Sequence, residues 1–199
     1  YIHPSNVLCY TKTGDYVPIS EAKHNPMDIV SAGWIGLGKY VAEKVESDML
    51  LVEWSTRSTQ FIPIKERKII VPPMSNFERI KNDFLLFYGV LETNIAHITP
   101  VFEYKGEVFN LPFKSHAITA DVFLLTNDIT VPTYICDTPD HSETTHEGAA
   151  MRIRKAFCDV ENKFDEQEIK AIAQLLKETM LQKITAIIES KLENYNLNN

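Results

Sequence analysis

The segment Asp165–Tyr195 constrains the fold more than any other part of this sequence, because it contains neither glycine nor proline. Its apolar residues recur every three or four positions, which is typical of one face of an α-helix. Asp165 and Glu168 have the spacing of a helix-start capping pair, and Phe164 and Ile169 can pack across it. At 1.5 Å per residue, the helix is expected to be about 45 Å long. The sequence therefore predicts one helix that is longer than a small domain can cover.

The apolar face of this predicted helix indicates a contact with another chain. We expect its first half, around Ile172 and Leu176, to belong to an internal core. Its second half carries Ile184, Ile187 and Leu192, and these side chains are expected to bind a protein partner or a second copy of the chain. The first function hypothesis is therefore a non-enzymatic structural subunit of a larger protein assembly, which docks through this helix.

Residues 1–72 are predicted to form short strands joined by tight turns, an arrangement typical of a small barrel or sandwich. Pro72-Pro73 follows the last of these strands and marks the predicted boundary between two domains, 1–72 and 74–199. The strands are expected at residues 7–11, 16–19, 40–45, 49–54, 60–64 and 68–71.

Aromatic residues in this region carry a resemblance to a known family. Trp34, Tyr40-Val41-Ala42, Val52-Glu53-Trp54 and Phe61-Ile62-Pro63 resemble the strand order of Tudor-type SH3-like barrels over residues 33–72. Ser55–Thr59 replaces the D-Y-G turn that accompanies the family's methyl-lysine or methyl-arginine cage. The resemblance implies a small β-barrel. Two interpretations of Trp34, Tyr40, Trp54 and Phe61 stay open, since they can line a peptide-binding face or fill the barrel.

Residues 74–199 are predicted to form an antiparallel β-meander packed with three helices, the last one long. Ser75 and Glu78 form a capping box, which begins a helix with a phenylalanine-rich face over residues 77–91. The fold class is therefore α+β, an SH3-like barrel followed by the meander and its helices. The four strands of the meander are expected at residues 97–104, 107–111, 117–125 and 129–135.

Two cysteines and two histidines lie close together in the sequence between the meander and the long helix. Cys136, His141, His146 and Cys158 are spaced C-x4-H-x4-H-x11-C. Four nitrogen and sulfur donors suit tetrahedral zinc, but this spacing matches none of the common zinc patterns. Thr144 has a glutamate three residues later, a capping box that explains the segment as a loop leading into a helix. We therefore predict no metal and keep these four residues as the metal candidates.

Motifs for enzymatic chemistry are sparse. The chain contains no phosphate-binding loop, dinucleotide fingerprint, zinc-protease motif or serine-hydrolase elbow. The alternative function hypothesis is a hydrolase. His97 and His3 would serve a phosphoesterase as general acid and base, or Glu103 and Lys105 would serve a nuclease. No catalytic residue is assigned and no cofactor is expected.

Charge and composition exclude further classes. The formal net charge is −7, residues 1–72 are neutral, and the 73–199 part carries the excess acid. Nucleic-acid binding needs lysine and arginine to neutralise phosphates, so a nucleic-acid partner is not expected. No apolar run approaches the roughly 20 residues that span a bilayer. Three cysteines without a disulfide framework favour a reducing compartment such as the cytoplasm.

Overall fold

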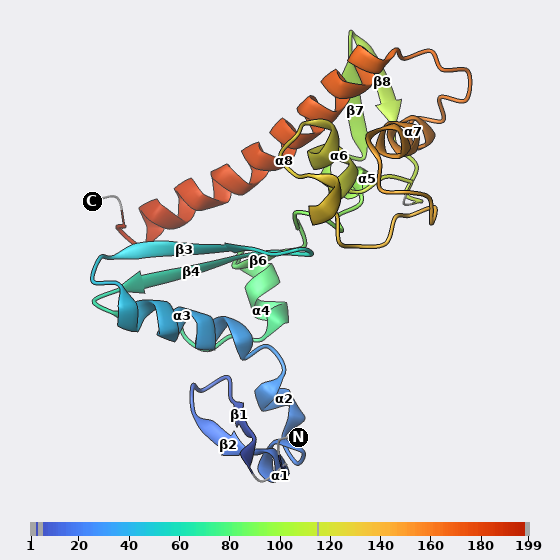
Figure 1. The fold of residues 1–199 in the computed structure, drawn as a ribbon. Coiled ribbons are helices and arrows are strands. Elements are labelled where there is room, and N and C mark those ends of the chain that lie inside the picture. The colour runs from blue at the N-terminus through green and yellow to red at the C-terminus, as the bar shows by residue number, and fades with distance from the viewer. Residues whose placement is uncertain (1–2, 4–5, 115, 198–199) are drawn as a thin grey trace. The chain divides into compact units, whose positions relative to one another are not determined.

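The computed structural model describes residues 3, 6–114 and 116–197. The chain combines helices with small open sheets, which confirms the α+β class (Figure 1). It folds into two compact units. Unit 1 contains the described residues up to Glu53, Gln60–Leu86, and those from Ile187 onward; unit 2 contains Trp54–Thr59 and Phe87–Ala186. The predicted division into domains 1–72 and 74–199 stays a prediction.

Unit 1 begins with a hairpin of β1 (Leu8–Tyr10) and β2 (Tyr16–Pro18), which pair antiparallel. Gly14 closes the turn with φ +89°, a left-handed conformation that glycine adopts without strain. These strands confirm the prediction for residues 7–11 and 16–19. Two short helices follow, α1 (Ile19–Ala22) and α2 (Pro26–Ile29).

The next element is a helix, α3 (Gly33–Lys44), so the strand predicted at residues 40–45 is wrong. The buried positions Trp34, Ile35, Gly38 and Ala42 recur at helical spacing. The prediction instead followed the alternation of polar and apolar residues at the end of this helix. Gly38 allows close packing, because a Cβ there would lie 2.7 Å from Cδ1 of Ile69.

The sheet of unit 1 is open. Its order is β3 (Met49–Trp54), β4 (Thr59–Lys65) and β5 (Lys68–Ile69), and β6 (Leu85–Leu86) also pairs with β4. No closed barrel occurs among the described residues. The predicted Tudor-type, SH3-like barrel is therefore wrong, because a helix stands where that family has barrel strands.

The helix α4 (Asn76–Lys81) starts at the predicted capping box, in which Ser75 N donates to Glu78 Oε2 at 2.8 Å. The predicted phenylalanine-rich core helix over residues 77–91 is nevertheless wrong. The helix ends at Lys81, Asp83 has a positive φ of 54°, and Phe77 is 77% exposed.

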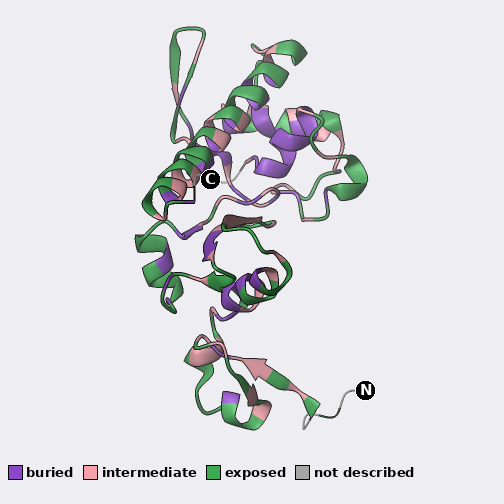
Figure 2. Ribbon diagram, turned by 90° about the vertical axis from the view of Figure 1, so that its left-hand side faces the viewer, coloured by how far each residue is buried: buried purple, intermediate pink, exposed green. Residues whose placement is uncertain are grey.

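Unit 2 contains the hairpin β7 (Val101–Tyr104) and β8 (Glu107–Asn110), preceded by the short helix α5 (Ile95–Ile98). This hairpin was predicted. The strands predicted at 117–125 and 129–135 are wrong, because these segments form α6 (Thr119–Leu125) and the 3-10 turn η2 (Val131–Thr133). Every residue of α6 is buried (Figure 2). A segment buried on all sides shows no helical periodicity, so it resembles a buried strand.

Two further helices complete the chain, α7 (His146–Ala156) and α8 (Glu166–Asn194). The long helix confirms the prediction. Asp165 N donates to Glu168 Oε2 at 2.8 Å and Glu168 N donates to Asp165 Oδ1 at 2.8 Å, so the capping pair is present.

Within the described residues, no helix is long and apolar enough to cross a membrane. The core of unit 2 lies among α6, α7 and the first half of α8, and includes Leu124, Ile153, Ile169, Ile172 and Leu176.

Candidate functional site

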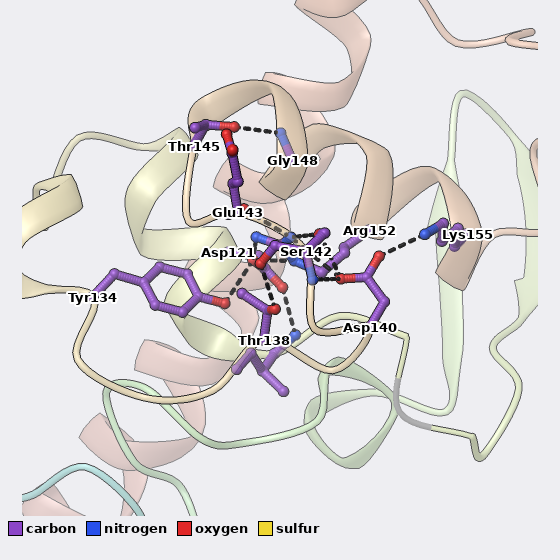
Figure 3. Close-up of polar contacts among 11 residues, drawn as sticks. Asp121, Tyr134, Thr138, Asp140, Ser142, Glu143, Thr145, Gly148, Arg152 and Lys155 are labelled. Atoms are coloured by element: carbon purple, nitrogen blue, oxygen red, sulfur yellow. Dashed lines mark hydrogen bonds and ion pairs between the residues drawn. The ribbon is translucent and has the colours of Figure 1, made fainter.

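A buried ion pair joins α6 to α7 in unit 2 (Figure 3). Asp121 and Arg152 are both fully buried, and Arg152 Nε donates a hydrogen bond of 2.9 Å to Asp121 Oδ1. Tyr134 Oη donates to the same oxygen at 2.9 Å, and the backbone N–H of Ile118 donates to Oδ2 at 3.0 Å. The carboxylate therefore has hydrogen bonds on both oxygens, as a buried charge requires.

The other arm of the Arg152 guanidinium holds the loop that precedes α7. Its Nη1 donates to Ser142 Oγ at 2.7 Å and to the Glu143 carbonyl at 3.2 Å. Nη2 lies 2.8 Å from Asp121 Oδ1 as an ion-pair contact, but has no hydrogen-bond partner among the described residues. One arginine thus ties α6, α7 and the loop into a rigid frame.

Burial and pairing act in opposite directions on this ion pair. Burial raises the pKa of the Asp121 carboxyl, and the hydrogen bonds from Arg152, Ile118 and Tyr134 oppose that shift. Burial lowers the pKa of Arg152, but its hydrogen bond and attraction to Asp121 outweigh this and raise it. Burial, together with the negative charge of Asp121, also raises the pKa of Tyr134. Tyr134 therefore keeps its proton and acts as a hydrogen-bond donor.

Asp140 extends the network to the surface. Its carboxylate accepts from Ser142 Oγ at 2.6 Å and from Lys155 Nζ at 2.5 Å, and it lies 3.5 Å from Arg152 Nη1. Partial burial raises the pKa of Asp140, but the hydrogen bonds from Lys155 and Ser142 outweigh that effect, so the net shift is downward. The ionised carboxylate fastens the loop to the last turn of α7.

The frame fixes one face of α7 beside the start of α8, where a cavity of about 490 Å³ opens. We call it the α7–α8 groove. Its apolar lining combines Leu125 and Ile169, which are buried, with the more exposed Met151. Its polar lining is drawn from the two helices and consists of His146, Glu147, Arg154, Glu166 and Lys170.

Most of the charged groups in the α7–α8 groove are available to a ligand. Arg154 is held by Asp159 at 2.9 Å. In the part of the chain that the structure describes, Glu147, Glu166 and Lys170 form no ion pair. The groove therefore offers an apolar surface flanked by charges of both signs, with an imidazole at its edge. Such a lining suits an elongated ligand that has an apolar middle and charged ends.

The aromatic residues predicted to share a binding face lie on different elements. Trp34 and Tyr40 lie on α3, where Trp34 is buried and Tyr40 is 62% exposed. Phe61 is buried in β4. Trp54 belongs to unit 2, where its ring contacts Phe123 at 5.6 Å. Without a barrel, the geometry on which this prediction depended is absent, and a binding role for these residues stays a prediction.

The predicted helix interface has mixed burial. Ile184 is 6% exposed, whereas Ile187 and Leu192 are half-buried. Their binding to another chain stays a prediction.

The metal candidates occupy different elements of unit 2. His146 begins α7, Cys158 follows that helix, and His141 is exposed in the loop before it. Among the described residues, no three His, Cys, Asp or Glu side chains come together in a way that could hold a metal ion. The observed helix cap is Thr145, which accepts from Gly148 N at 3.0 Å, one residue after the predicted Thr144.

In unit 2, the residues of the hydrolase hypothesis lie on α5 and on the β7–β8 hairpin. His97 lies on α5 with its ring against Tyr88, and Lys105 pairs with Glu168 at 2.6 Å rather than with Glu103. Pro4 and Ser5 of the His3 motif lie outside the described residues.

Sequence reasoning missed Asp121, Tyr134 and Arg152. A signal was present for Asp121 alone, as a charged residue inside the mostly apolar run that leads to Leu125.

Comparisons with known proteins give the chain a different context. No family model matches it. It is 29% identical over 192 residues to a protein of Methanocaldococcus jannaschii called (4-{4-[2-(gamma-L-glutamylamino)ethyl]phenoxymethyl}furan-2-yl)methanamine synthase. The aligned region covers 96% of this chain and 58% of that protein. A protein of Methanococcus vannielii with the same name is 27% identical over 161 residues, or 81% of this chain and 72% of that protein. The chain thus spans less than two thirds of the Methanocaldococcus jannaschii relative.

These relatives overturn the function hypotheses drawn from the sequence. Both are synthases, so the prediction of a non-enzymatic structural subunit is wrong, and so is its alternative of a phosphoesterase or nuclease. The sequence did not indicate a synthase, because the chain carries none of the common catalytic motifs.

Proposed function

We propose that this protein takes part in the synthesis of (4-{4-[2-(gamma-L-glutamylamino)ethyl]phenoxymethyl}furan-2-yl)methanamine, the compound for which both relatives are named. The observation that carries the proposal is the extent of the similarity, which runs over 96% of the chain. A similarity confined to one motif would support only a shared element, whereas one of this length supports a shared fold. A shared task also needs a site with suitable chemistry.

The lining of the α7–α8 groove supports the proposal. The named compound has two aromatic rings joined by an ether, a primary amine at one end, and a glutamyl group with its own amine and carboxyl at the other. The groove pairs an apolar surface with Glu147 and Glu166, which suit amines, and with Lys170, which suits a carboxylate. We assign the groove to this class of ligand. The three cysteines, which are all unpaired, support a cytoplasmic setting for this synthesis.

Complementation tests the proposed function. Methanococcus vannielii cells depleted of their own synthase would receive the gene for this protein, and the named compound would be measured by mass spectrometry. We expect its level to recover, as it does with the resident gene as positive control. If the protein accumulates in folded form and the compound stays absent, the proposal is wrong.

Filling the groove tests the assigned site. Ala150 lines the groove on α7, whereas Ala171 is exposed on α8 and does not line it. We expect Ala150→Trp to weaken binding of the named compound at least about tenfold, as measured by calorimetry, since the new side chain takes the ligand's place. Ala171→Trp is the matched control and should bind normally. Equal binding by the two variants, with equal melting temperatures, would remove the groove from the proposal.

A further inference from the structure

Three phenylalanine rings enclose a second cavity in unit 2. Phe109, Phe157 and Phe164 contact one another edge to face, with centroid distances of 5.4 Å for 109–157, 5.8 Å for 109–164 and 5.8 Å for 157–164. They line a cavity of about 280 Å³, which we call the phenylalanine pocket. All three residues are half-buried, and all three line this cavity.

The three rings come from three different segments. The Asp159 carboxylate forms hydrogen bonds with two of these segments, α7 and the residues before α8. Phe109 lies on β8, Phe157 caps the end of α7, and Phe164 precedes α8. Asp159 accepts from Phe164 N at 3.2 Å, from Lys163 N at 2.7 Å and from Arg154 Nη1 at 2.9 Å. Because Arg154 also lines the α7–α8 groove, this ion pair connects the walls of the two cavities.

The charged lining of the phenylalanine pocket is predominantly acidic. Glu107, Asp159 and Glu161 face one base, Lys163, which pairs with Glu161 at 3.1 Å. Asp159 is already occupied by Arg154 and by backbone amides. In the described chain, Glu107 has no ion-pair partner. The pocket therefore joins exposed aromatic surface to one carboxylate that is free to receive a cation.

We propose that the phenylalanine pocket binds an aromatic ring that carries a protonated amine. Ring edges and faces of phenylalanine favour a second aromatic ring in edge-to-face or offset contact. The negative faces of the same rings attract an ammonium group, and a carboxylate at the rim pairs with it. The pocket chemistry alone selects this class. The choice of a furan with a methanamine arm as its member rests on the proposed function.

Binding of small probes tests the class of ligand. The probe is furan-2-ylmethanamine, compared with furan-2-ylmethanol, which lacks the charge, and cyclohexylmethanamine, which lacks the aromatic ring. We expect the aromatic amine to bind about tenfold more tightly than either, as measured by calorimetry on the whole protein. Equal affinity for the alcohol, equal affinity for the cyclohexyl amine, or no binding of the aromatic amine overturns the proposal.

Cys158 reports the place of binding, because it is exposed and lines the phenylalanine pocket. Saturating furan-2-ylmethanamine is expected to slow alkylation of Cys158 several-fold, read by peptide mass spectrometry, and to leave Cys9 unaffected. Glu107→Gln should weaken binding about tenfold, and Glu103→Gln, an exposed glutamate on the same hairpin, should not. Both variants should melt as the parent does. Binding without protection of Cys158, or equal losses in the two variants, overturns the proposal.

The two proposals can fail separately. A protein that restores the named compound in cells but does not bind the aromatic amine in the phenylalanine pocket refutes the pocket and leaves the synthase. A protein that binds the amine with the expected dependence on Glu107, yet restores no compound, refutes the synthase and leaves the pocket.

Discussion

At the scale of single residues, Arg152 has two roles, since its guanidinium neutralises Asp121 and hydrogen-bonds to the loop before α7. Arg152→Met leaves the buried Asp121 charge without its counter-ion. We expect a loss of about 3–5 kcal/mol in the free energy of unfolding, measured in urea.

The double variant Arg152→Met, Asp121→Asn tests the cause of that loss. Its amide oxygen can still accept from Tyr134 or Ile118, and no buried charge remains. We expect it to be more stable than Arg152→Met alone. A double variant that is less stable than the single one would show that the lost guanidinium contacts, and not the stranded carboxylate, cause the loss.

Asp140 makes stability depend on pH at the acidic end. Its pKa in the folded protein is lowered by Lys155 and Ser142, below the unfolded value of about 3.9. The carboxylate therefore stabilises the fold above that pH, and the contribution is lost as the pH falls toward the folded pKa. We expect Asp140→Asn to be less stable than the parent near neutral pH, and the difference to shrink below about pH 4.

Urea midpoints measured across this range check the prediction. Asp137→Asn serves as control, because Asp137 is exposed in the same loop. A difference between Asp140→Asn and the parent that stays constant with pH would exclude the proposed role of Asp140.

Residue-scale chemistry was the part least accessible from the sequence. The partners Asp121 and Arg152 are separated by 31 positions, and nothing local to either one specifies the other. Asp121 lies within an apolar run, where a strand and a buried helix look alike. The α7–α8 groove and the phenylalanine pocket also combine residues from separate elements, so their linings appear only once the chain is folded.

At the scale of elements, the start of α8 rests on Asp165, whose carboxylate accepts from Glu168 N. Asp165→Ala removes this acceptor and leaves the backbone N–H unpaired. We expect a loss of about 1 kcal/mol in the free energy of unfolding, measured in urea. Asp165→Asn keeps an acceptor oxygen and should lose less. Equal losses in the two variants would mean that the side chain stabilises the helix by its charge and not as a cap.

Elements with strong local signals were predictable, and elements defined by their surroundings were not. The long helix α8, the two hairpins β1–β2 and β7–β8, and the capping box at Ser75 followed from periodicity and turn chemistry. The helix α3 was missed because its last residues alternate in polarity. The barrel was wrong in part for the same reason, since a helix replaces one of the strands predicted to close it and the remaining strands form open sheets.

At the scale of the whole molecule, both sides of Pro72-Pro73 contribute to unit 1. β5 lies before Pro72-Pro73 in the sequence and β6 lies after it, and both strands are hydrogen-bonded to β4. We expect a proteolytic nick at residues 72–75 to leave the two fragments bound to each other. Size-exclusion chromatography under native conditions, followed by denaturing electrophoresis, measures this. Fragments that separate without denaturant would instead support two independent domains, 1–72 and 74–199.

The membership of α8 in both units has a consequence for how the protein is made. The Lys191 ammonium lies 3.8 Å above the Phe84 ring and donates to the Asn82 carbonyl at 2.6 Å, and the Tyr195 ring also contacts Phe84. The ribosome synthesises residues 82–84 about a hundred positions before these partners, and synthesis proceeds at roughly 5–20 residues per second. The core of unit 1 therefore stays incomplete for several seconds during synthesis. Unit 2 has all its residues before the last turns of α8 are synthesised. Of the two units, the one that begins earlier in this sequence is therefore the one that finishes folding last.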